Sequence, residues 1–268
     1  MKIISDFHLH TSFSEDSETP METMVLSAIR RGLKTICFTE HLDLDFPPEY
    51  GTFSLDLNAY TTELFRLQSR YEKDIEILLG IEFGMQPHLW EQYLDITNYY
   101  PFDFIIASQH LLDRADPYSP RYWQGKNEQE CYKAYFTQML SNLQTMKSYD
   151  TLGHLDYIVR YGPNKNKHYS YETYASCIDP ILEYLIRHEK CLEVNTAGLK
   201  YGLGHPNPEE SVLRRYLELG GTLITIGSDA HRPEHIAYDF EKAEDILRSL
   251  GFQSYTIFRQ RKPVQISL

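Results

Sequence analysis

Short apolar runs rich in β-branched residues alternate along this chain with longer amphipathic stretches. The short runs predict β-strands, because a strand buried on both faces consists of a few consecutive apolar residues. The longer stretches place apolar residues on one face of a helix and predict the helices between the strands. The predicted strands cover residues 3–7, 35–38, 76–81, 104–107, 151–155, 192–195 and 222–226, and a late strand at 255–258 closes the series.

Two of the predicted helices carry start signals. Thr19–Glu22 combines an N-cap residue, a proline at the first helical position and a capping-box glutamate. Asn207–Glu210 has the same arrangement. Gly32 and Gly220 are expected to end the helices that precede strands, since glycine readily adopts the left-handed conformation found there.

Repeated alternation of strand and helix in 268 residues predicts an α/β fold, a β/α barrel, with an open doubly wound sheet as the alternative. We find no linker, solenoid repeat or low-complexity tract, so residues 1–268 are interpreted as a single domain. The segments Leu42–Ser54 and Asp113–Asn127 are long and irregular. Such loops in a compact domain are often lids or substrate-binding segments.

Composition narrows the class of function. The apolar fraction of 42% is ordinary for a globular protein. The formal net charge of −12 argues against a non-specific nucleic-acid binder, which needs clustered Lys and Arg. A small phosphorylated substrate stays compatible with this charge, because the local potential of a site can oppose the global sign. Metal ions would supply that local positive charge.

The sequence also predicts a location. We see no signal peptide and no apolar stretch long enough for a membrane span. The cysteines form no CxxC pair, and Cys37 and Cys191 lie in apolar runs, where a reduced thiol is expected. We therefore expect a cytoplasmic protein without membrane or nucleic-acid partners, present as a monomer or small homo-oligomer.

The predicted strands share one feature: a histidine or a carboxylate stands at the C-terminal end of most of them. In a β/α barrel these ends meet at one mouth, where the active sites of such enzymes lie. The recurrence along the chain favours one shared site over scattered surface residues. The residues concerned are His8, His10, His41, Glu82, His110, His154, Asp229 and His231.

The first strand suggests what these residues do. His8 and His10 are expected on the same side of the strand, an arrangement that suits two imidazoles on one metal ion. Asp6 falls on that side too and is expected to orient a ligand histidine. Imidazoles mixed with carboxylates, without cysteine, suit zinc, manganese or iron. The candidates exceed the needs of one ion, so two or three clustered ions with a bridging carboxylate are implied.

The series Asp-x-His-x-His, Glu-His, Glu, His, His and Ser-Asp-Ala-His runs from Asp6 to His231 and resembles the polymerase-and-histidinol-phosphatase (PHP) family of phosphoesterases. The resemblance implies a distorted (β/α)7, TIM-like barrel with a trinuclear metal centre at the C-terminal ends of the strands. The chain is most similar to the stand-alone bacterial histidinol phosphatases. Its length, the segment Phe13–Ser17, and Gly153–Asp156 followed by Arg160 carry that similarity.

The resemblance also assigns ligands to three divalent ions, zinc, manganese or iron. Asp16 stands where some relatives have a histidine, and a carboxylate there is expected to favour manganese or iron over zinc. The implied sets are His8 and His10 with bridging Glu82 and with Asp229 for the first ion, Glu82, His110 and His154 for the second, and Asp16, His41 and His231 for the third.

The activity implied by this branch is hydrolysis of L-histidinol phosphate to L-histidinol and phosphate, in histidine biosynthesis. We expect a metal-bound, bridging hydroxide to attack phosphorus in line with the leaving alcohol, because metals lower the pKa of bound water. Such a reaction needs no nucleophilic side chain, so Ser228 is interpreted as a hydrogen-bonding residue. The proton donor stays open between a metal-bound water and a site carboxylic acid.

Other residues receive supporting roles. Arg160 could form a fork of hydrogen bonds to phosphate oxygens, and Lys200 is a second candidate. Asp6, Glu40 and Asp156 are expected behind the metal ligands. Glu15, Asp43 and Asp45 could meet the substrate's cationic groups, but we expect them to be solvated loop residues. Five further histidines are interpreted as lying outside the site: His88, His168, His188, His205 and His235.

Three other functions are alternatives to this one. A phosphatase of other or broad specificity for phosphomonoesters is the principal alternative. A nuclease is disfavoured by the acidic charge and by the absence of polymerase modules. A non-catalytic binding module is disfavoured because the series of ligand residues is complete.

Overall fold

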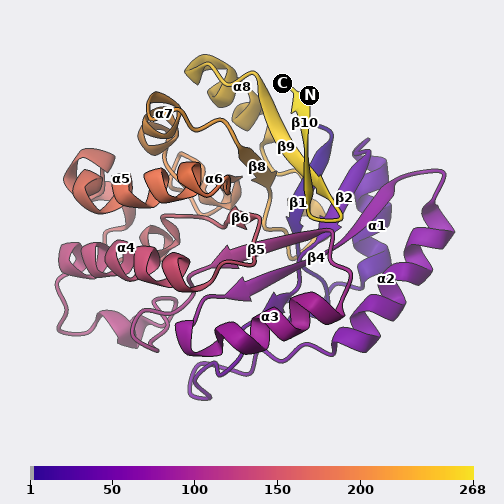
Figure 1. Cartoon of the computed structure of the whole chain (residues 1–268), viewed down its shortest axis with the longest axis horizontal. Coiled ribbons are helices and arrows are strands. Elements are labelled where there is room, and N and C mark those ends of the chain that lie inside the picture. The colour runs from indigo at the N-terminus through magenta and orange to yellow at the C-terminus, as the bar shows by residue number, and fades with distance from the viewer. Residues whose placement is uncertain (1–2) are drawn as a thin grey trace.

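The computed structural model describes residues 3–268, so the first two residues of the expected domain lie outside its description. Its centre is a nearly closed barrel of parallel strands (Figure 1). The two-residue strand β3 (His41–Leu42) pairs with β4 beside the main series. The barrel strands are β1 (Ser5–Leu9), β2 (Thr35–Phe38), β4 (Glu76–Gly84), β5 (Phe104–Ser108), β6 (Thr151–Leu152), β7 (Cys191–Asn195) and β8 (Ile224–Gly227).

The strands follow one another in the order β1-β2-β4-β5-β6-β7-β8, and every neighbouring pair is parallel. The last strand returns to the first through a parallel bridge between Leu9 and Ala230. At this bridge the His10 amide donates to the Ala230 carbonyl at 2.9 Å. The predicted distorted (β/α)7 barrel is confirmed, and the open-sheet alternative is wrong.

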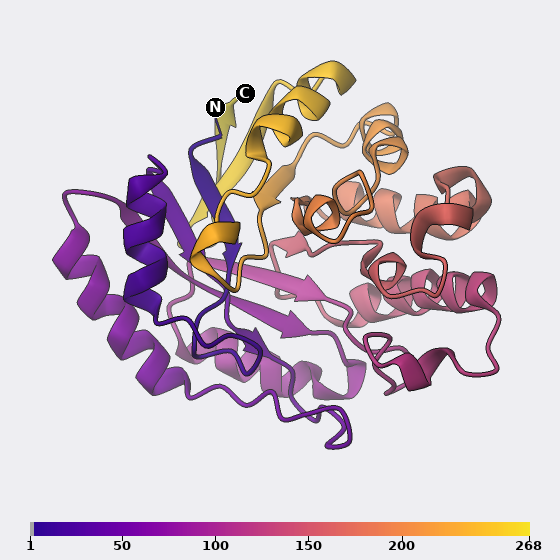
Figure 2. The ribbon, with the colours of Figure 1, turned by 180° about the vertical axis from the view of Figure 1, so that it is seen from behind.

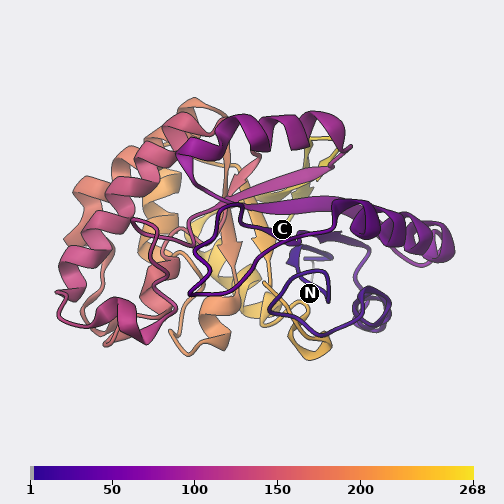
Figure 3. The same ribbon diagram turned by 90° about the horizontal axis from the view of Figure 1, so that it is seen from below.

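Helices surround this barrel on the outside (Figures 1, 2 and 3). Their buried faces pack against the strands, as the amphipathic pattern predicts. Short 3-10 turns lie at 87–89, 120–123, 157–160, 165–168 and 233–235. The α-helices are α1 (Met21–Arg30), α2 (Leu57–Tyr71), α3 (Trp90–Tyr99), α4 (Glu128–Thr145), α5 (Tyr171–Arg187), α6 (Ala197–Lys200), α7 (Glu210–Glu218) and α8 (Phe240–Leu250).

Both predicted helix starts lie one or two residues too early. Helix α1 has Pro20 at its N-cap, and the Thr19 hydroxyl donates to the His231 carbonyl at 3.0 Å instead of capping the helix. Helix α7 has Glu209 at its N-cap, whereas Asn207 is fully buried. In each case the polar side chain has a partner other than the helix: the His231 carbonyl for Thr19, and Arg160 for Asn207. The helix ends are as predicted, since Gly32 and Gly220 follow α1 and α7 with φ of 80° and 94°.

Three of the differences from the predicted strand bounds concern candidate site residues. Strand β1 begins at Ser5 and ends at Leu9, so His8 lies inside it. Strand β4 continues past its predicted end to Gly84, which places Glu82 within the barrel wall. Strand β6 stops at Leu152, and His154 lies just beyond it.

The late strand does not join the barrel wall. Strand β9 (Ser254–Arg259) pairs antiparallel with β10 (Lys262–Ser267), and this hairpin covers the N-terminal ends of the barrel strands. Arg259 forms two 2.6 Å hydrogen bonds with Glu76, at the start of β4. The Gln260 amide donates to Asp103, just before β5. The expectation that this strand completes the barrel series is therefore wrong; the hairpin closes the end opposite the candidate site.

Removing the Arg261 side chain should loosen this hairpin. Its Nε donates to the buried Asp150 carboxylate, which also accepts the Ile105 amide at 2.8 Å. Loss of one hydrogen bond to a charged, largely buried partner destabilises a protein by about 1.5–3 kcal/mol. We expect Arg261→Ala to lower the free energy of unfolding in urea by that amount. Lys262→Ala, at an exposed neighbouring position, is the control; equal stability of both variants would contradict the role of this contact.

Among residues 3–268, no helix combines the length and the apolar character needed to cross a lipid bilayer.

Candidate metal centre

Glu82 lies at the middle of a cluster of side chains at the C-terminal ends of the barrel strands. The residue is fully buried. Its Oε1 lies 3.0 Å from His154 Nε2 and 3.2 Å from His110 Nε2. Its Oε2 lies 3.0 Å from His41 Nδ1 and 3.2 Å from His8 Nε2. One carboxylate thus contacts histidines that come from four different places in the barrel.

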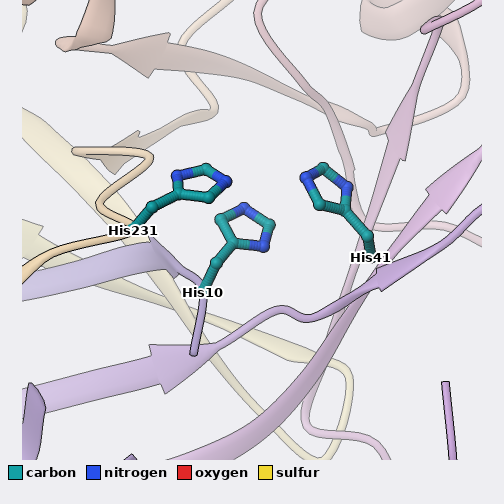
Figure 4. A group of neighbouring side chains, drawn as sticks. All are labelled: His10, His41 and His231. Carbon is teal, nitrogen blue, oxygen red and sulfur yellow. The ribbon is translucent and has the colours of Figure 1, made fainter. Parts of the chain in front are cut away.

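A second group consists of His10, His41 and His231, whose rings face a common space (Figure 4). The ring of His10 stacks against His41 at a centroid distance of 4.2 Å and against His231 at 4.3 Å. Asp16 closes this group from the solvent side, with its Oδ2 2.9 Å from His231 Nε2 and 3.6 Å from His41 Nε2. The side chain of Asp16 remains 43% exposed.

Asp229 joins the two groups. It follows β8 in the left-handed conformation, with φ of 53°, and this turn directs its carboxylate into the cluster. Its Oδ1 lies 3.6 Å from His10 Nε2 and 3.9 Å from His8 Nε2. Its Oδ2 accepts a 2.8 Å hydrogen bond from Arg160. The structure therefore brings together all nine residues that the sequence analysis named as metal ligands.

The chemistry of the cluster fits metal ions. Nε2 of His8, His10 and His231 and Oε2 of Glu82 are buried, and none of them forms a well-directed hydrogen bond among residues 3–268, although oppositely charged groups lie within 4 Å. Buried polar atoms are normally paired, so unpaired atoms that converge on one space indicate a bound ion. Nitrogen and oxygen donors without sulfur suit zinc, manganese or iron. Donor atoms within 4.8 Å of one another form five overlapping groups: His8–His10–Glu82, Glu82–His110–His154, His10–His41–His231, His8–His154–Asp229 and His41–Asp43–His110.

Electrostatics prepare only some of these donors for metal binding. Burial lowers the pKa of His8, His41 and His110, but the neighbouring carboxylates outweigh it and raise these pKa values, so a metal ion would have to displace protons from these rings. Burial raises the pKa of Glu82, but the surrounding histidines, His8 first, outweigh it and hold this pKa well below its ordinary value. The pKa of Asp229 is likewise held low against its burial, mainly by His8 and Arg160. Burial and the neighbouring His41 lower the pKa of His10. Ionised carboxylates and a neutral imidazole are the forms that coordinate metals.

His8 is oriented by a residue that the sequence analysis missed. Its Nδ1 lies 2.6 Å from Glu193 Oε1, within strand β7, and Glu193 is buried. Gly227 makes this approach possible, because a Cβ there would overlap both His8 and Glu193. The signal in the sequence is a single acid inside the otherwise apolar start of the run Cys191–Asn195.

Two further carboxylates stand behind metal-ligand candidates. Asp43 was expected to be solvated, which is wrong: it is 4% exposed and lies 2.7 Å from His110 Nδ1. Glu40 acts through an intermediate, since it accepts a 2.6 Å hydrogen bond from the Ser14 hydroxyl, which lies 3.3 Å from His10 Nδ1. These contacts fix the ring orientation and leave the opposite nitrogens facing the cluster.

Asp6 does not orient a histidine ring, and that expectation is wrong. Its carboxylate accepts hydrogen bonds from the amide and hydroxyl of Ser228 and from the Ala237 amide. Only the backbone of His8 approaches it, at 3.4 Å. Asp6 therefore holds the loop after β8, which carries Asp229. Ser228 is a hydrogen-bonding residue at a strand end, as predicted.

Arg160 and Lys200 both lie in the wall of a cavity of about 530 Å³ that opens over the cluster. Arg160 is buried, and besides Asp229 it donates to Asn207 at 2.7 Å and Asn195 at 2.9 Å. Each terminal nitrogen of its guanidinium carries a second N–H that these bonds do not use. Lys200 donates to the Asp229 carbonyl at 3.0 Å.

Asp156 supports this arginine rather than a metal-ligand candidate. Its carboxylate accepts hydrogen bonds from the side chain of Asn207 and from the Glu209 amide, and Asn207 in turn contacts Arg160. The expected position behind the metal ligands is therefore wrong for Asp156. It fixes the acceptor of the Arg160 Nε–H instead.

The remaining histidines divide into two kinds. His235 lines the cavity, contrary to the expectation that it lies outside the site. His88 is exposed and pairs with Asp45 at 2.9 Å, away from the cluster. His168, His188 and His205 do not line the cavity among the described residues.

Replacing Glu193 with Gln should weaken metal binding without removing a metal-ligand candidate. The variant keeps the size of the side chain but loses the charge that pairs with His8 Nδ1. Changes in such outer partners typically reduce metal affinity or activity about 10- to 100-fold. Competition with a chromophoric chelator would measure the affinity. Glu189→Gln, just before the same strand and exposed, is the control; equal affinities would contradict the role of Glu193.

A buried cluster of histidines and carboxylates at the C-terminal mouth of a parallel barrel is the arrangement of metal-dependent barrel hydrolases. The chain belongs to the PHP domain family, whose sequence model matches residues 6–197.

Several similar proteins are named as histidinol phosphatases. A histidinol-phosphatase of Lactococcus lactis is 33% identical, with 96% of this chain and 95% of the relative covered. A probable histidinol-phosphatase of Clostridium acetobutylicum is 34% identical, with 90% and 91% covered. A crystal structure of the histidinol phosphate phosphatase of Lactococcus lactis, complexed with zinc, L-histidinol and phosphate, has a TM-score of 0.90 at 32% identity and covers 98% of this chain and 99% of that one.

Proposed function

We propose that this chain hydrolyses L-histidinol phosphate to L-histidinol and phosphate. One observation carries the proposal: the cluster around Glu82 lies at the mouth of a barrel that matches, over 98% of the chain, the fold of a phosphatase solved with zinc, L-histidinol and phosphate. The cavity over the cluster is of the size that small-molecule sites have, and it holds both basic and aromatic side chains.

The proposal includes three divalent ions, with zinc, manganese and iron as the candidates. Asp229 would hold the first ion together with His8, which lies in β1, and His10, which directly follows β1. Glu82 would bridge the first and second ions. When bound, such ions supply a water of lowered pKa and neutralise charge on the phosphate oxygens. The proposed ligand sets are His8, His10, Glu82 and Asp229, then Glu82, His110 and His154, then Asp16, His41 and His231. Support comes from the donor groups His8–His10–Glu82 and Glu82–His110–His154, and from the approach of Asp16 to His231 and His41.

The chain's own residues would position the phosphate. Arg160 is held rigidly by three acceptors, so its unused N–H groups can donate to phosphate oxygens without further ordering. Lys200 adds a positive charge at the same wall; burial lowers its pKa. The ester's hydrocarbon part and imidazole would then lie against aromatic side chains of the two long loops, including Phe53 and Tyr118.

We further propose that residues 1–268 form one domain that acts as a monomer or small homo-oligomer in the cytoplasm. Four free cysteines, three of them buried, support a reducing compartment.

The proposal is tested by phosphate release from L-histidinol phosphate against a panel of other phosphomonoesters and labelled single-stranded DNA, with zinc or manganese supplied. The expected result is a strong preference for L-histidinol phosphate that is lost on chelation. Chelator-sensitive hydrolysis of the other esters without this preference would keep the chemistry and reject the substrate. DNA digestion at a comparable rate would favour a nuclease.

A further inference from the structure

Asp116 differs from the other acidic residues that line the cavity over the metal centre. Four acidic side chains line it: Asp16, Asp43, Asp116 and Asp229. Asp16 contacts His231, Asp43 contacts His110, and Asp229 contacts Arg160, so each of these has a basic partner. Asp116 forms no hydrogen bond or ion pair with a basic side chain among residues 3–268, although His110 lies near enough to act on its charge. It is the one carboxylate of this lining without a direct basic partner.

Asp116 is nevertheless held in place. It is 8% exposed, and its Oδ1 accepts the Tyr118 amide at 2.8 Å. That contact leaves Oδ2 without a protein partner within the described chain. Burial raises the pKa of Asp116, and the nearby His110 opposes this shift. A largely buried carboxylate without a cation is costly, so its presence in a cavity wall indicates a cationic ligand.

The surroundings of Asp116 suit an organic ammonium group better than another metal ion. The rings of Tyr118 and Tyr157 line the same cavity, and Tyr157 lies 5.5 Å from the ring of His110. Aromatic faces attract organic cations, and a carboxylate beside them completes a site for an amine. Arg160 and Lys200 contact Asp229, and Arg160 also lies 5.4 Å from the centre of the Tyr157 ring, so Tyr157 borders the basic wall. Asp116 lies on a different segment, the one that follows His110.

We propose that Asp116 binds the ammonium group of the substrate and thereby selects phosphomonoesters of amino alcohols. This inference rests on the proposed function, because L-histidinol phosphate carries an ammonium group on the carbon next to the ester-bearing carbon. The phosphate lies at the metal centre and the basic wall, and the amine lies at Asp116. The residue thus determines specificity and takes no part in the bond-breaking step.

The test compares two esters on the metal-loaded enzyme: L-histidinol phosphate and the imidazolylpropyl phosphate that lacks the amino group. In Asp116→Asn, Oδ1 still accepts the Tyr118 amide but the charge is gone. We expect the ratio of kcat/KM for the two esters to fall about 10- to 100-fold, the range for a hydrogen bond to a charged group. Binding of the product L-histidinol, measured by calorimetry, should weaken in parallel.

Asp113→Asn is the matched control, because Asp113 lies on the same segment, is exposed and does not line this cavity. Its ester ratio should equal that of the wild type. An unchanged ratio in Asp116→Asn, or an equal loss on both esters, would overturn this inference alone. If the wild type fails to hydrolyse L-histidinol phosphate, the proposed function fails and this inference falls with it. Should Asp116→Asn not fold, Asp116→Glu provides the same comparison with a displaced charge.

Discussion

Replacing Glu82 with Gln is expected to abolish turnover of L-histidinol phosphate and to lower the bound-metal content. The carboxylate lies within 4 Å of five histidine nitrogens and belongs to two of the groups that could hold an ion. An amide presents one weakly basic oxygen in place of two charged ones, so it cannot bridge two ions in the same way. The loss in kcat/KM should exceed about 100-fold, the upper end for an outer partner of a metal ligand.

Metal analysis of the purified variant separates this explanation from simple unfolding. Circular dichroism should show the fold retained, while elemental analysis shows fewer ions per chain than in the wild type. Glu91→Gln, on the exposed side of α3, is the control and should keep its metals. Full activity with a full set of ions in the Glu82 variant would contradict the assignment of this residue.

Replacing Arg160 with Ala is expected to reduce both activity and stability. The guanidinium is buried and pairs with Asp229 at 2.8 Å, so its removal leaves a buried carboxylate without its partner. Breaking a buried pair from one side costs about 3–5 kcal/mol, measurable as a lower free energy of unfolding in urea. Loss of a donor to the reacting phosphate should also reduce kcat/KM roughly 100-fold or more.

Arg160→Lys distinguishes charge from geometry. A lysine keeps the positive charge but cannot reach Asn207, Asn195 and Asp229 with a planar fork. We expect it to recover part of the stability and little of the activity, with the metal content unchanged. Wild-type kinetics in Arg160→Ala would show that Arg160 has a structural role only and does not bind the phosphate.

The ligand candidates were predictable from the sequence because the barrel makes their positions regular. Strands are local patterns, and the C-terminal ends of parallel strands converge, so His8, His41, His110 and His154 must approach one another once the barrel closes. The number of residues between these histidines adds nothing to this prediction. For these residues the prediction needed only the strands and their order, and small errors in strand ends did not affect it. The choice of Asp16, which lies well after the end of β1, and the division into three ligand sets came from the family resemblance.

The second layer was not predictable in the same way. Which carboxylate meets which imidazole depends on side-chain direction across strands that are distant in sequence, such as Glu193 and His8. Asp43 follows the short strand β3, and the missing side chain of Gly84 lets it approach β4. Asp6 lies on the expected strand, but backbone amides of the loop after β8 satisfy its carboxylate.

The hairpin β9–β10 shows a different limit. The apolar run at 255–258 predicts a strand, but its composition does not determine whether that strand extends the barrel wall or covers the end of the barrel. The charged residues around it decide this, since Arg259 and Arg261 find Glu76 and Asp150 at the N-terminal ends of β4 and β6. Such long-range pairs become visible only in the folded chain.

The most direct test of the account is a zinc titration of the metal-stripped enzyme, followed by phosphate release from L-histidinol phosphate. The account predicts no activity without metal, and a rise that reaches its plateau only when three equivalents are bound. Activity in the stripped enzyme, or a plateau after a single equivalent, would contradict the trinuclear centre around Glu82 and His10.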